Sequence, residues 1–151
     1  MDVCRIQFVV PGAPSPKGRP IAGKTQSGKI VMRTPKKTEQ REGVVAALAA
    51  QAMAGQPPLD GAVTLLVKAV FEVPKSWPLY KKTAAEAGAL HPTGRPDLDN
   101  IVKLVSDGCN GIVWGDDSQI VSIIARKEYG FPARVAVAAY TGAAPQRQAG
   151  S

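Results

Sequence analysis

The sequence is poor in cysteine, histidine and aromatic residues, and it contains no long apolar run. Its two cysteines, Cys4 and Cys109, have no CxxC spacing, so neither a disulfide scaffold nor a structural zinc site is expected. Without a run of about 18 apolar residues, a transmembrane helix is excluded. The first ten residues lack the apolar core of a secretory signal. We therefore expect a cytoplasmic protein that does not contact a membrane.

The 151 residues fit one globular domain, because 44% are apolar and 21% are charged. We place this domain at residues 1–141. Within it, residues 11–33 are rich in proline, glycine and positive charge, and we expect a long irregular loop there. Residues 142–151 are expected to form a flexible tail.

Positive charge is concentrated at the start of the chain. Residues 1–41 hold nine Lys or Arg against two acids, which equals the +7 of the whole protein, and the remaining residues balance ten against ten. A basic arm on a neutral body indicates a polyanionic partner, most simply nucleic acid, although a solvated loop is the alternative. No aromatic residue occurs between Phe8 and Phe71, so the arm suits the phosphates of duplex DNA better than single strands. The candidate contacts are Lys17, Arg19, Lys24, Lys29, Arg33, Lys36 and Lys37.

Hydrophobic periodicity predicts a mixed arrangement of strands and helices. Alternation over residues 63–73 is the strongest strand signal, and Thr34-Pro35 is a typical helix start. The order β-α-β-α-α-β-β favours an α+β fold in which helices pack on a small mixed sheet. The other expected elements are strand 5–10, helix 76–90, helix 97–110, and an antiparallel pair formed by 120–128 and 134–140.

A phosphate-loop pattern, GxxxxGK[ST], occurs at residues 18–25 but is rejected. Such a loop needs a strand directly before it and a helix directly after it. Gly28 and Pro35 interrupt the segment that follows, so no nucleotide cofactor is expected.

Acidic residues gather in two short blocks, RPDLDNIVK at 95–103 and WGDDSQ at 114–119. On a helix over 97–110, the apolar residues share one face, and Asp97 takes the N-cap position. The opposite face carries Asp99, Lys103, Asp107 and Asn110.

Carboxylates in a protein that attracts phosphates suggest a bound cation. Mg²⁺ takes oxygen ligands from carboxylates, water and substrate phosphates, and it can activate water for phosphodiester cleavage. Lys103 would then neutralise transition-state charge or orient the water. Taken singly, Asp97 is explained as a cap, Asp99 and Lys103 as a surface ion pair, and Asp116 with Asp117 as turn residues.

The pattern RPDLDN-x2-K followed by WxDDSQ resembles the RusA family of Holliday-junction resolvases, small endonucleases frequent in prophages. The resemblance runs from about Pro74 to Tyr129 and includes a segment that adds Lys81 and Lys82 to the candidate DNA contacts. It implies that Asp97, Asp99 and Asp117 are metal-binding catalytic acids and that Lys103 is the catalytic lysine, with Asp116 as a possible further ligand.

The resemblance also implies a homodimer that binds a four-way junction and makes paired nicks with Mg²⁺, for which Mn²⁺ would substitute. The alternatives are a non-catalytic DNA-binding protein and two other nuclease types that act on branched DNA. A restriction-like nuclease needs a (D/E)xK motif after Pro96-Asp97, and none follows. An RNase H-like nuclease needs its leading carboxylate in a strand.

Three aromatic residues, Trp77, Tyr80 and Trp114, are candidates for a wedge that enters a DNA junction. Trp114 lies beside a glycine in a turn, and we expect it in the core instead. His91, in a proline-flanked loop, is expected at the surface.

Overall fold

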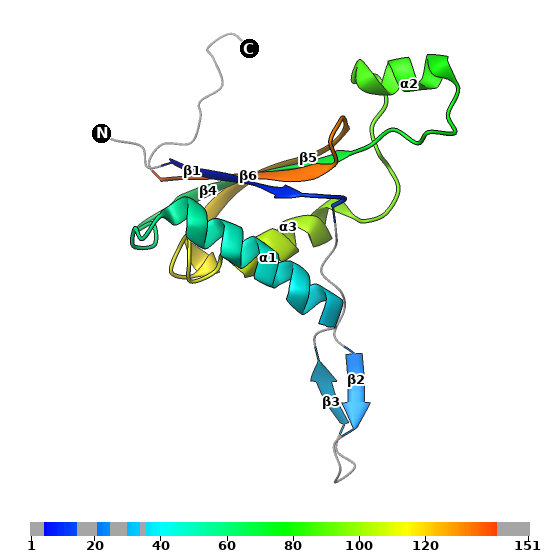
Figure 1. Ribbon diagram of the computed structural model, residues 1–151. Helices are drawn as coiled ribbons and strands as arrows, with labels where there is room; N and C mark the ends of the chain where they lie inside the picture. Colours follow the sequence, from blue (N-terminus) through cyan, green and yellow to red (C-terminus); the bar gives the residue numbers. More distant parts are fainter. Residues whose placement is uncertain (1–4, 15–20, 25–29, 34–35, 142–151) are drawn as a thin grey trace.

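The structure is a computed structural model that describes residues 5–14, 21–24, 30–33 and 36–141. A four-stranded mixed sheet carries helices on one face, which confirms the expected α+β class (Figure 1). The strands are β1 Arg5–Pro11, β2 Ile21–Lys24, β3 Ile30–Arg33, β4 Val63–Phe71, β5 Ile120–Tyr129 and β6 Arg134–Thr141. The helices are α1 Lys36–Met53, α2 Leu79–Glu86 and α3 Leu98–Cys109, and a 3-10 turn, η1, spans Asp117–Gln119.

The sheet has the order β1-β6-β4-β5, with β4 paired antiparallel to β6 and parallel to β5. The predicted antiparallel pairing of 120–128 with 134–140 is therefore wrong, because β5 and β6 lie on opposite sides of β4. The connection between them crosses the end of β4, where the Gly130 amide donates to the Phe71 carbonyl at 2.9 Å. A Cβ on Gly130 would lie 2.9 Å from Val70 Cγ1, so the crossing leaves little room for a side chain.

Helices α1 and α3 cover one face of the sheet and enclose the core, in which Trp114, Leu65 and Ile101 are fully buried. The apolar face of α3 packs inward, as its periodicity predicts. The two helices approach closely at Gly108, because a Cβ there would lie 2.6 Å from Val45 Cγ1. This contact fixes the position of α3, which has Asp97 as its N-cap and Asp99 in its first turn.

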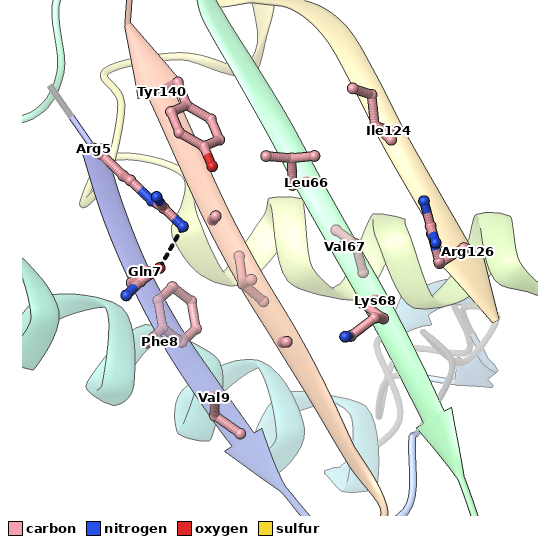
Figure 2. A pocket seen from close by; sticks show the side chains of 13 residues that line it. Arg5, Gln7, Phe8, Val9, Leu66, Val67, Lys68, Ile124, Arg126 and Tyr140 are labelled. Carbon is pink, nitrogen blue, oxygen red and sulfur yellow. Dashed lines mark hydrogen bonds between the residues drawn. The ribbon is translucent and has the colours of Figure 1, made fainter. Parts of the chain in front are cut away.

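The other face of the sheet is open over its middle and forms a hollow of about 610 Å³ (Figure 2). Ala136 and Ala138 on β6 make its floor, because their side chains are short beside those of the flanking strands. Its rim is basic. Arg5 donates a hydrogen bond to Gln7 Oε1 at 2.8 Å, and Lys68 forms an ion pair at 3.3 Å with Glu128, which does not line the hollow.

Two local predictions differ from the structure. The segment 11–33, expected to be irregular, contains the antiparallel ribbon β2–β3, because its β-branched residues at 21, 30 and 31 favour extended backbone. Helix α2 is shorter than the expected 76–90, since Pro78 takes the N-cap position and Gly88 has a positive φ of 83°. The expected start at Thr34-Pro35 and the tail 142–151 lie outside the described residues. Among the described helices, none has the length and apolarity needed to cross a membrane.

Candidate active site

The N-terminal end of α3 presents two exposed carboxylates. Asp97 occupies the N-cap position with extended backbone (φ −67°, ψ 143°), and its carbonyl accepts from the Ile101 amide at 3.2 Å. Its side chain, however, makes no capping hydrogen bond. Asp99 lies in the first turn and is exposed as well. The helix therefore uses the backbone of Asp97 but leaves its carboxylate available.

Lys103 lies one turn after Asp99 and is also exposed. Within the described part of the chain, the side chains of Asp97, Asp99 and Lys103 form no hydrogen bond or ion pair. From the sequence, Asp97 is explained as a cap, and Asp99 and Lys103 as a surface ion pair. Neither side-chain interaction is present among the described residues. Two acids and one ammonium face solvent together at the start of a well-anchored helix.

Asp117 lies in a different environment beyond the C-terminal end of α3. The indole Nε1 of buried Trp114 donates to Asp117 Oδ1 at 2.8 Å, which confirms the core position expected for Trp114. Burial, and secondarily the nearby Asp117 charge, raises the pKa of the Cys109 thiol to about 12. One oxygen of the half-buried Asp117 carboxylate thus accepts a hydrogen bond that satisfies the buried indole of Trp114.

Asp116 has a structural role at the start of η1. Its Oδ2 accepts from the Ser118 amide at 3.0 Å, and Gln119 Oε1 accepts in return from the Asp116 amide at 3.0 Å. Hydrogen bonds from the side chain and then the backbone of Ser118 lower the pKa of Asp116. Each of the two adjacent acids thus has one carboxylate oxygen in a hydrogen bond that stabilises this part of the fold.

Sequence reasoning missed Gln119, which fixes the position of this turn. Its Nε2 donates to the Leu59 carbonyl at 2.9 Å and to the Gly61 carbonyl at 3.0 Å, so it joins η1 to the segment before β4. The signal was present in the sequence, because an acid followed three residues later by glutamine is typical of a capping box.

The two groups of acids lie at opposite ends of α3. The helix has 12 residues and is therefore about 18 Å long. In Figure 1 the yellow turn η1 lies at the far end of α3 from the loop that arrives from α2. Within the described residues, no group of three acidic, histidine or cysteine side chains is close enough to hold a metal. Asp97 and Asp99 do offer the oxygen donors that Mg²⁺ uses when it binds through one or two carboxylates, water and phosphate.

The basic arm lies beyond α1. Lys24 is on β2, Arg33 on β3, and Lys36 and Lys37 begin α1, while Lys17, Arg19 and Lys29 lie outside the described residues. The ribbon β2–β3 projects away from the sheet past the N-terminal end of α1 (Figure 1). Lys81 and Lys82 are on α2, and His91 is exposed as expected.

Comparisons with known proteins agree with this arrangement. The model of the family "Endodeoxyribonuclease RusA" matches residues 11–139. The "Uncharacterized protein YqaN" of Bacillus subtilis (strain 168) is 40% identical over 134 residues, which cover 87% of this chain and 93% of that protein. The family match spans residues 11–41 of the basic arm, the acids of α3 and η1, and strands β4 and β5 of the main sheet. The chain therefore belongs to the RusA endodeoxyribonuclease family.

Proposed function

We propose that this protein is a Mg²⁺-dependent endonuclease that resolves four-way DNA junctions by paired nicks. The observation that carries the proposal is the pair of exposed carboxylates of Asp97 and Asp99 at the start of α3, which have no partner in the described part of the chain. They occur in a basic protein of an endodeoxyribonuclease family. A protein that only binds DNA gains nothing from placing negative charge on such a surface.

Asp97 and Asp99 would hold the ion together with water and a DNA phosphate. When bound, Mg²⁺ supplies an activated water and stabilises the leaving oxygen, and Mn²⁺ would substitute. Lys103 projects on the same exposed side, one turn along α3, where its ammonium neutralises charge that develops on the phosphate. The basic arm, whose ribbon β2–β3 lies beyond the N-terminal end of α1, would supply sequence-independent phosphate contacts.

A homodimer explains the separate position of Asp117. Helix α3 and strand β5 run in opposite directions: Lys127, near the end of β5, donates to the Gly94 carbonyl just before α3, whereas Cys109 at the end of α3 lies near Asp117 just before β5. A two-fold axis through the middle of β5 would bring the start of α3 in one protomer to the end of α3 in its partner. Asp97 and Asp99 would then meet the partner subunit's Asp117.

Strand β5 has the properties of such an interface. It is an edge strand, and Val121, Ile123 and Ile124 are 68%, 50% and 41% exposed. An edge with free backbone groups and apolar side chains favours pairing with another strand. In a two-fold dimer the same strand supplies both halves of the contact. The open apolar positions on β5 therefore support this edge as the surface between protomers.

The nuclease activity is tested with a synthetic four-way junction and a linear duplex of the same sequence. We expect paired nicks in the junction in the presence of Mg²⁺ or Mn²⁺, none in EDTA, and an intact linear duplex. Metal-independent binding without any nicking would contradict the proposal and favour a non-catalytic DNA-binding protein.

The dimer is tested separately by analytical ultracentrifugation. Ile123→Glu should convert the dimer to monomer, because it places like charges opposite each other at the two-fold contact. Val44→Glu is the matched control, since Val44 on α1 is 42% exposed and lies away from β5. A monomeric wild type, or equal effects of both substitutions, would contradict the β5 interface.

A further inference from the structure

One end of the molecule carries unusually exposed apolar side chains. Phe131, between β5 and β6, is 82% exposed, and Leu79 and Tyr80, at the start of α2, are 78% and 76% exposed. These are the highest values among the large apolar side chains of the described residues. Solvent contact at this level is costly for a ring unless it has a partner.

The supports beneath these side chains are well defined. The Trp77 ring meets the Tyr129 ring edge-on at 5.4 Å, and Lys81 Nζ lies 4.0 Å from the centre of the Trp77 ring, so the start of α2 is attached to the end of β5. Next to Phe131, Arg134 Nη1 donates to the Pro132 carbonyl at 2.8 Å. Phe131 and Tyr80 therefore project from a connected platform.

This platform lies at the same end of the sheet as Asp97 and Asp99. Lys127 Nζ donates to the Gly94 carbonyl at 2.6 Å, which ties the end of β5 to the loop just before α3. In Figure 1, α2, the β5–β6 connection and the N-terminal end of α3 share this end. A DNA strand held at the carboxylates is thus within the neighbourhood of the platform.

We propose that the rings of Phe131 and Tyr80 stack on bases that are exposed at the branch point of the DNA, while Lys75, Lys81 and Lys82 contact the adjoining phosphates. This inference rests on the proposed function and adds a source of selectivity to it. Every base has a flat face that stacks on an aromatic ring, so the contact needs no particular sequence. In a linear duplex these faces are covered by neighbouring base pairs, whereas a branch point leaves some of them open.

The chemistry of the surrounding residues favours nucleic acid over a protein partner. Lysine is depleted at protein–protein interfaces, but three lysines accompany the exposed rings here. Rings interleaved with positive charge are the usual composition of a surface that binds unstacked bases. The basic arm, residues 1–41, has Phe8 as its one aromatic residue. The arm and the aromatic platform would therefore recognise different parts of the same DNA.

The test measures binding in EDTA by the full-length protein, so that no cleavage takes place. The probes are a four-way junction with 2-aminopurine at the branch point and a linear duplex with 2-aminopurine at the same sequence position. Phe131→Leu and Tyr80→Leu keep apolar bulk but remove the aromatic face, and Val44→Ala is the control for an exposed apolar residue elsewhere. We expect each leucine variant to weaken junction binding roughly tenfold and duplex binding less than twofold, with a smaller 2-aminopurine signal on the junction.

Equal weakening on both DNAs, or wild-type junction binding by the leucine variants, would overturn the inference. So would a change in oligomeric state, which would show that the rings contact protein. Failure of the wild type to nick junctions with Mg²⁺ is a different result, which contradicts the proposed function and is read from cleavage rather than from binding.

Discussion

The two ends of α3 carry the same kind of residue in opposite circumstances. At the start of the helix, Asp97 and Asp99 are exposed and have no partner within the described residues. Beyond its end, Asp117 accepts a hydrogen bond from buried Trp114, and Asp116 caps η1. The fold therefore engages one carboxylate oxygen of Asp116 and of Asp117 at one end of α3, and it leaves the carboxylates of Asp97 and Asp99 without a partner at the other end.

The largest effect on nicking is expected at the N-terminal end of α3, where Asp97 and Asp99 are exposed. Asp99→Asn should reduce nicking by about 10³-fold, because the amide cannot replace the charge that holds the ion, while junction binding persists. Cleavage kinetics and gel-shift titrations with Mg²⁺ measure the two properties. Asp60→Asn, another exposed acid, is the control. Full activity of the Asp99 variant would remove this residue from the site.

At the other end of α3, two substitutions of Asp117 should have different effects on stability. Asp117→Asn should lose nicking, because the amide lacks the charge that would hold the ion. It should keep its melting temperature, because the amide oxygen still accepts from Trp114. Asp117→Leu should also lose about 1–3 kcal/mol of stability, since the buried indole N–H is then unsatisfied. Urea denaturation of both variants tests this difference, and equal stabilities would contradict the structural part of the account.

The position of α3 itself depends on its contact with α1. Gly108→Ala should destabilise the protein by about 1–3 kcal/mol, because the new Cβ would lie 2.6 Å from Val45 Cγ1. The double variant with Val45→Ala should recover little of this loss, because the new Cβ would still lie 2.7 Å from Val45 Cβ. If the single variant is as stable as wild type in urea, the helices are not in the close contact described.

The smallest expected effect concerns pH. The pKa of Cys109 is raised from 9.0 to about 12 in the folded protein, so its contribution to stability is complete below pH 9 and is lost as the pH rises towards 12. The slope should reach about 1.4 kcal/mol per pH unit at most. Urea denaturation between pH 8 and 10.5 should show a steeper decline for wild type than for Cys109→Ala. Parallel curves would mean that the thiol is not protected by burial.

Much of the fold was predictable because periodicity reports burial. The alternation around Val67 and the apolar face of α3 both identified their elements. Strand pairing was not predictable: β5 and β6 are adjacent in sequence and suggest a hairpin, yet both pair with β4. The hydrogen bond from Gly130 to Phe71, which sets this crossing, depends on tertiary structure alone.

The candidate site was predictable as a set of residues but not as a geometry. The motif singled out Asp97, Asp99 and Asp117 together, whereas their separation follows from the length and direction of α3, which a motif does not encode. The spacing of Asp116 and Gln119 indicates the capping box, but the hydrogen bonds from Gln119 to Leu59 and Gly61 depend on tertiary structure.

The proposal that the two ends of α3 meet across two protomers is tested directly by mixing two inactive variants. Asp99→Asn and Asp117→Asn proteins, each inactive alone, should regain about one quarter of wild-type nicking when equal amounts exchange subunits, because half of the dimers then hold one intact site. Asp97→Asn mixed with Asp99→Asn should stay inactive, since both changes fall in the same half-site. If the first mixture also stayed inactive while subunit exchange was demonstrated, the two-protomer site would be contradicted.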